Sequence, residues 1–138
     1  MVDIIELLYR QYKHLRDETE KIWNEQNDIQ LTTAEWYVIN HINQGASTVP
    51  EIMKRMDITK QAVHKFFNGL EEKGIVQTAL IKAPKTQRNA TLTSLGYEVI
   101  DKSALIQVKI VKQIEHNIGN ENYLKLKELL NMPWQDSE

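Results

Sequence analysis

The chain has 138 residues, no cysteine and a formal net charge of −2 at pH 7. This length suits a single domain (1–138) with a core that needs no disulfides, and the lack of cysteine excludes thiol-based sensing and cysteine-ligated zinc. Asp3 and Glu6 interrupt the N-terminal apolar run, and no run approaches the ~20 residues of a membrane span. We therefore expect a cytoplasmic protein without a membrane partner.

Two helices are predicted in the first third of the chain. Residues 3 to about 27 contain no proline or glycine, and apolar residues recur along one side at helical spacing. Thr32-x-x-Glu35 is a capping box that starts a second helix, which should end near Gly45. The first helix has more apolar surface than a small domain buries, so we expect part of it to pack against a second subunit.

Two short helices follow. Thr48-x-x-Glu51 is another capping box with Pro50 in its first turn, and a new helix starts at the cap Thr59 and ends at Gly74. One face of this second helix is apolar, and its other face is basic or neutral: Lys60, Gln61, His64, Lys65 and Asn68. Such a pair is typical of a DNA-reading helix-turn-helix, although plain helical hairpins share the outline.

The pattern after Gly74 is that of a hairpin. Residues 75–81 and 89–93 are rich in strand-forming side chains, and residues 82–88 have the composition of a tip that carries Lys82, Lys85 and Arg88. A hairpin with a basic tip after a reading helix is typical of a winged helix, and an arginine at the tip suits the narrow minor groove. A basic solvent loop without a partner is the other interpretation.

Two more helices are predicted at the C-terminal end. Thr93 caps a long helix that runs to about residue 117, and a short helix spans residues 121–131, with Pro133 preventing its continuation. Long helices at both ends of the chain suggest a dimer platform around a compact lobe.

The distribution of charged residues supports the division of the chain into a compact lobe and terminal dimerisation helices. From Lys54 to Thr93 the chain has eight basic and three acidic residues, whereas the remainder has nine basic and sixteen acidic residues. A basic segment on an acidic body is typical of a protein that presents one face to a nucleic acid, although charge clusters also occur on solvated surfaces.

The predicted fold class is mainly α (α+β): a winged helix-turn-helix with a two-stranded β-wing and long N- and C-terminal dimerisation helices. Residues 31–93 would form the DNA-binding lobe. Residues 1–30 and 94–138 would form the helical dimerisation region.

The sequence resembles the MarR family of bacterial transcription regulators, which are dimeric winged-helix proteins. The resemblance is strongest over residues 31–96, where LTTAEWYVINHI is similar to the family's second helix, TVPEIMKRMDITKQAVHKFFNGLEEKGIV to its helix-turn-helix and LTSLG to the start of its fifth helix. It implies a homodimeric regulator, most simply a repressor, that binds a pseudo-palindromic double-stranded DNA operator. The DNA-binding positions it implies, together with the basic wing, are Thr59, Lys60, Gln61, Ala62, His64, Lys65, Asn68, Lys82, Lys85 and Arg88.

The wing departs from the family pattern. The family usually has an Asp-x-Arg motif whose arginine enters the minor groove, and the corresponding residues here are Thr86, Gln87 and Arg88. The arginine is present, the aspartate is absent, and the return strand is about two residues shorter than is common. Arg88 is the predicted minor-groove residue, with Lys85 as the alternative.

The family also implies a small aromatic effector, held between the dimer helices and the DNA lobe. The candidate ligand-binding residues on those segments are Tyr9, Tyr12, Trp23, Trp36, Tyr37 and His41. Aromatic residues at helical spacing are more often core, so core packing is the other interpretation. The histidines lack metal-site spacing, and we predict no metal site and no cofactor.

An enzyme and a protein-interaction module are the other functional classes to consider beside a DNA-binding regulator. An enzyme would need a nucleophile with a base or paired carboxylates on one face, and the sequence has neither these nor a glycine-rich phosphate loop, so we predict no enzyme. The remaining alternatives are a winged-helix protein-interaction module and a regulator without a small-molecule effector.

Overall fold

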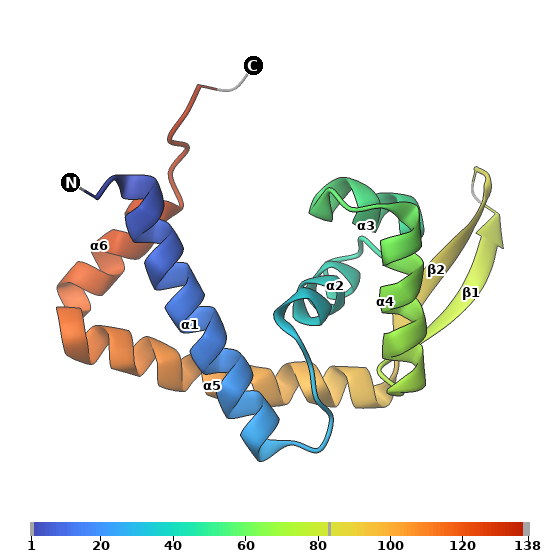
Figure 1. Cartoon of the computed structure of the whole chain (residues 1–138), viewed down its shortest axis with the longest axis horizontal. Helices are drawn as coiled ribbons and strands as arrows, with labels where there is room; N and C mark the ends of the chain where they lie inside the picture. The colour runs from blue at the N-terminus through green and yellow to red at the C-terminus, as the bar shows by residue number, and fades with distance from the viewer. Residues whose placement is uncertain (1, 83, 137–138) are drawn as a thin grey trace.

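The computed structural model describes residues 2–82 and 84–136, and within them the chain forms a winged helix with long helices at both ends. The elements in chain order are α1 (Ile4–Gln26), α2 (Thr33–Asn43), α3 (Val49–Met56), α4 (Lys60–Glu72), β1 (Val76–Lys82), β2 (Thr86–Leu92), α5 (Ser94–Ile118) and α6 (Asn120–Leu130). Figure 1 shows α1, α6 and the far half of α5 at one end, and α2, α3, α4 and the hairpin at the other. The predicted mainly α fold is confirmed.

Side-chain caps set the start of the helices at the predicted residues. Thr32 and Thr48 each form a complete capping box with the glutamate three residues later. The hydroxyl of Thr59 accepts a hydrogen bond from the backbone N–H of Ala62 at 3.1 Å, and Thr93 caps α5 in the same way. These bonds satisfy N–H groups that the first turn leaves unpaired, so each helix begins where its cap lies.

Two left-handed residues bracket α4. Asp57 ends α3 with φ 52°, a conformation that its short polar side chain tolerates better than most residues do. Gly74 follows α4 with φ 79°, as predicted from its place after the last apolar position. The chain therefore turns sharply on both sides of the helix, which leaves α4 held against the lobe with one face free.

The core lies beneath α4. Val63, Phe67 and Leu70 on this helix are fully buried against Ile52 of α3 and further apolar side chains of the lobe, which include Val38, Ile39, Ile75, Val76 and Ala90. Burying side chains of this size stabilises the fold by roughly 1.5–3 kcal/mol each. The apolar face of α4 fixes its position, and its opposite face is left to solvent.

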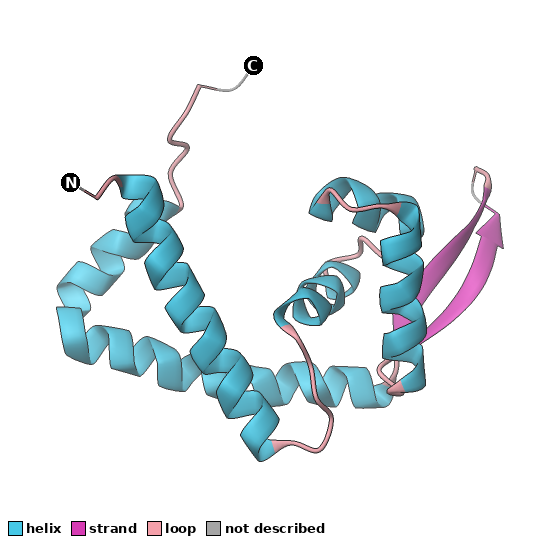
Figure 2. Ribbon diagram, viewed as in Figure 1, coloured by secondary structure: helices cyan, strands magenta, loops and turns pink. Residues whose placement is uncertain are grey.

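The hairpin is longer than the sequence predicted. β1 pairs with β2 in antiparallel register from Val76 opposite Leu92 to Lys82 opposite Thr86, beside α4 at the edge of the lobe (Figure 2). The expected tip of residues 82–88 was therefore wrong in its extent, because Lys82 and residues 86–88 belong to the ladder. Ala83, part of that expected tip, lies outside the described residues.

Apolar side chains remain exposed on the helices outside the lobe. α6 has no buried residue, and the exposed large apolar residues on α1, α5, α6 and the tail include Ile4, Ile5, Leu8, Tyr9, Leu105, Val108, Leu124, Leu129, Leu130 and Trp134. Exposed apolar surface of this kind is typical of interaction sites. Among the described residues, no helix is long and apolar enough to cross a membrane.

Candidate nucleic-acid interface

The free face of α4 presents the residues that the sequence indicated. Lys60, Gln61, Lys65 and Asn68 are exposed, and His64 is half-buried between them and the hairpin. The first turn carries no acidic residue, so the positive end of the helix dipole is not neutralised there. This face can therefore approach an anion.

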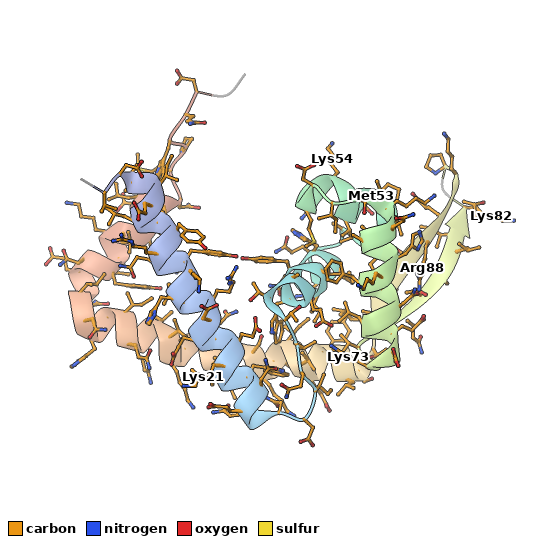
Figure 3. All side chains as sticks on the ribbon, viewed as in Figure 1. Lys21, Met53, Lys54, Lys73, Lys82 and Arg88 are labelled. Carbon is orange, nitrogen blue, oxygen red and sulfur yellow. The ribbon has the colours of Figure 1, made fainter. Side chains whose placement is uncertain are left out.

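Basic side chains flank this face on both sides. Figure 3 shows Lys54 on α3 and Lys82 at the end of β1 extending away from the body of the lobe. Within the part of the chain that the structure describes, Lys60, Lys65, Lys82 and Lys85 form no ion pair. Their charges are consequently free to meet phosphate groups.

Arg88 is placed differently from its prediction. It lies in β2 opposite Leu80 rather than at a tip, and its side chain is only 17% exposed. Its Nη2 donates to Asn68 Oδ1 at 2.8 Å and to Thr78 Oγ1 at 3.0 Å, and the guanidinium lies 5.6 Å from the centre of the Phe67 ring. The expectation of a tip arginine was wrong because β2 begins two residues before Arg88, and acceptors on α4 and β1 hold the side chain inward.

The same guanidinium reaches two more side chains of α4. Arg88 Nη1 lies 3.1 Å from His64 Nδ1, and Arg88 Nη2 lies 3.5 Å from a carboxylate oxygen of Glu71. Two of the predicted DNA-binding residues, His64 and Asn68, are therefore bonded to a third, Arg88. Periodicity did not reveal this cluster, because a strand arginine facing a helix has the same sequence signature as one facing solvent.

Glu71 completes the cluster from the end of α4. Its carboxylate accepts the backbone N–H of Thr78 at 2.8 Å, and this bond is the main reason that the pKa of Glu71 lies below its usual value. The Thr78 hydroxyl and the charge of Arg88 lower this pKa further. The carboxylate stays ionised and ties β1 to α4, next to the guanidinium that it partly balances.

A cavity of about 230 Å³ lies between α1, α2 and α5. Tyr12, Trp36 and Tyr37 from the predicted ligand set line it, and the hydroxyls of Tyr12 and Tyr37 are hydrogen-bonded across it. The sequence did not indicate the polar lining of this cavity, which includes Arg16, Glu20, Asn40, Ser103 and Gln107. Those residues are scattered over three helices, so only the packing of the helices reveals that they share a site.

The other predicted ligand residues lie elsewhere. Trp23 is 1% exposed, packs edge-on against Trp36 and donates its indole N–H to the carbonyl of Ile29 at 2.8 Å, and it does not line this cavity. Tyr9 is exposed on α1, outside the cavity lining, and His41 does not line the cavity either. Trp23 belongs to the hydrophobic core of the protein.

His41 sits on the inner side of α2. Burial, together with the charge of Arg55, lowers the pKa of His41 below its ordinary value. Its Nδ1 atom is buried and has no hydrogen-bond partner among the described residues. Residues 2–82 and 84–136 hold no group of three or more side chains arranged to bind a metal ion.

The lobe matches a known family in sequence. The model of the MarR family aligns with residues 29–85, a segment that contains α2, α3, α4 and β1. Over this segment, which is less than half of the chain, the sequence is similar to the MarR family. No curated protein sequence matches the chain.

Solved structures agree with the MarR fold at low sequence identity. The reduced form of MarR from E. coli has 18% identity and a TM-score of 0.80, with 94% of this chain and 95% of that one covered. The YusO protein from Bacillus subtilis has 19% identity and a TM-score of 0.70, covering 93% and 89%. A MarR family protein from Mycobacterium tuberculosis, solved with salicylic acid, has 20% identity and a TM-score of 0.71, covering 94% and 95%. At these identities the structures show the shared fold alone.

Proposed function

We propose that the protein is a cytoplasmic homodimeric transcription repressor, in which each subunit places α4 in one major groove of a pseudo-palindromic operator. The observation that carries this proposal is the free face of α4, which has no acidic residue in its first turn and lies between lysines of the helix and the hairpin that form no ion pair among the described residues. Residues 31–93 would read the DNA. Residues 1–30 and 94–138 would pair two such lobes.

The residues divide into two roles in this proposal. Thr59, Lys60, Lys65, Lys82 and Lys85 contact phosphates and set the position of the lobe on the duplex. Gln61 and His64 face base edges, with Ala62 close to them and Asn68 further along the same face. In a symmetric dimer, two copies of α4 then meet half-sites about one helical turn apart, ~34 Å.

Binding to the DNA upstream of the protein's own gene tests the proposal. Fluorescence anisotropy should show a complex with one such duplex that is at least ~10³-fold tighter than the complex with a random duplex of equal length. Both affinities should fall steeply as salt rises, because phosphate contacts release counterions. Equal affinity for all duplexes at low salt would contradict the proposal and favour a protein-interaction module.

A small aromatic effector is the second part of the proposal. The cavity between α1, α2 and α5 has aromatic walls from Tyr12, Trp36 and Tyr37, and the indole N–H of Trp36 is buried without a partner among the described residues. An effector there would displace α1 relative to α2 and so change the spacing of the two lobes. Isothermal titration with salicylic acid should give heat and a loss of operator affinity. A panel of phenolic acids that gives neither would contradict this part.

A further inference from the structure

We propose that Arg88 is a positioning residue that acts through His64. It holds the imidazole as the Nε2–H tautomer, so that α4 offers the operator one fixed hydrogen-bond donor and rejects cytosine at the base pair that His64 meets. This inference rests on the proposed DNA binding, and it assigns to the wing arginine a role within the protein instead of a role in the minor groove.

The tautomer follows from the chemistry of the contact. Arg88 Nη1 and His64 Nδ1 are 3.1 Å apart, which is within hydrogen-bonding distance. A guanidinium has only donors, so Nδ1 must be the acceptor and must carry a lone pair. The single imidazole proton of the neutral ring is then on Nε2.

The guanidinium is held independently of His64. Asn68 and Thr78 each accept from Nη2, Glu71 pairs with the same nitrogen at 3.5 Å, and the Phe67 ring lies under the guanidinium. Three of these partners are on α4 and one is on β1. Because the contacts come from two elements, Arg88 cannot swing away without breaking several bonds, and its Nη1 stays directed at His64.

A fixed hydrogen-bond donor favours bases that offer an acceptor and disfavours cytosine. In the major groove guanine offers N7 and O6, adenine offers N7 and thymine offers O4 as acceptors, whereas cytosine offers only its N4 amino group, which is a donor. An Nε2–H facing cytosine would put two donors together. Without Arg88 the imidazole is free to take the Nδ1–H tautomer, which turns Nε2 into an acceptor that cytosine satisfies.

The first experiment measures the tautomer in the DNA-free protein. Long-range ¹H–¹⁵N spectra of the wild-type protein should show His64 with a proton on Nε2 and a hydrogen-bonded, unprotonated Nδ1. Arg88→Gln should shift the His64 Nδ1 resonance and increase the Nδ1–H fraction, whereas Arg55→Gln, which removes a charge from α3, should leave the His64 resonances unchanged. A wild-type Nδ1–H, or a spectrum that Arg88→Gln does not alter, would overturn the inference.

The second experiment measures base preference at each operator position by competition with single-base variants. Wild-type protein should bind a duplex with cytosine at the His64 position about tenfold or more weakly than the preferred duplex. Arg88→Gln should remove this penalty at that position alone, and Lys85→Gln should weaken every duplex by the same factor. An unchanged cytosine penalty in Arg88→Gln would overturn the inference.

A third variant guards against a folding defect in Arg88→Gln. His64→Ala keeps Arg88 and removes the hydrogen-bond donor, so it should bind duplexes with and without cytosine at that position equally. A retained penalty in His64→Ala would count against the inference. A wild-type protein with no sequence preference would refute the proposed function and the base-reading step, while the spectrum would still decide whether Arg88 sets the tautomer.

Discussion

A basic side chain contributes to DNA binding only if the protein leaves it free. Lys60, Lys65 and Lys85 form no ion pair within the described residues, whereas Arg88 is bound on several sides. The sequence indicated all four as DNA-binding residues, because composition and spacing do not show which basic residue meets an acceptor inside the fold. Three-dimensional neighbours therefore separate phosphate-binding residues from residues that organise the reading surface.

Alanine substitutions at Gln61 and Lys85 should change DNA binding in different ways. Gln61 is exposed near the start of α4, where an amide side chain suits a bidentate bond to adenine, so Gln61→Ala should reduce discrimination at one base position by ~1–3 kcal/mol. Lys85→Ala should weaken all duplexes alike and reduce the salt slope by about one. Anisotropy titrations of both variants against specific and random duplexes make the comparison. Equal losses on both duplexes for Gln61→Ala would remove its base-reading role.

His41 should titrate below the ordinary value for histidine. Burial and the charge of Arg55 disfavour its protonated form in the folded protein. The unfolded chain then binds the proton more readily, so His41 should cost stability as the pH falls below about 6.5. NMR titration should find the lowered pKa, and Arg55→Gln should raise it partway towards the ordinary value. A pKa at or above about 6.5 would contradict this assignment.

At the scale of elements, helix starts and ends were predicted well because their signals are local. A threonine cap and a glutamate three residues later act within one turn, and α2 and α3 begin where those pairs lie. The hairpin was predicted less well, since the length of a ladder depends on pairing with the opposite strand. Pro84 marked the connection, but nothing in the sequence showed that Thr86, Gln87 and Arg88 would pair with β1.

The junction between the lobe and α5 depends on Gly96. A Cβ atom at this position would lie 2.4 Å from the backbone carbonyl oxygen of Ile75, and the same oxygen accepts the N–H of Thr93 at 3.0 Å. Gly96→Ala must therefore push α5 away from the strand, and it should reduce the free energy of unfolding by about 1–3 kcal/mol. Urea denaturation measures the change.

Gly69 provides the matched control for this prediction. It lies within α4, and nothing is within 4 Å of a Cβ added there. Gly69→Ala should be neutral or should stabilise the protein by about 0.5–1 kcal/mol, because alanine loses less conformational freedom than glycine in a helix. Similar denaturation midpoints for the Gly96→Ala and wild-type proteins would contradict the proposed close packing at the junction.

At the scale of the whole molecule, most of the exposed large apolar residues lie on the helices and tail outside the lobe. The predicted arrangement of a compact lobe between long terminal helices is present, but a single chain leaves residues such as Ile5, Leu105 and Leu129 in water. The sequence showed an apolar excess on α1 but not which faces stay uncovered, because that depends on how α1, α5 and α6 cross. A second copy of the chain is the partner we propose for this surface.

Charge placed on this surface should separate the subunits. Leu129 on α6 is 47% exposed, and Leu129→Glu would bury a carboxylate in an apolar interface, at a cost that the dimer cannot offset. Multi-angle light scattering should give two chains per particle for the wild type and one for Leu129→Glu. Leu80→Glu, at an exposed apolar position of the hairpin, should remain dimeric. A wild-type monomer at micromolar concentration would contradict the proposed homodimer.

Selection of bound duplexes from a random pool tests the central claim most directly, because it reports sequence preference and symmetry together. The proposed homodimer with one copy of α4 in each of two major grooves predicts enrichment of an inverted repeat whose half-sites are about 10 base pairs apart, centre to centre. A pool without enrichment, or an enriched sequence without two-fold symmetry, would contradict it.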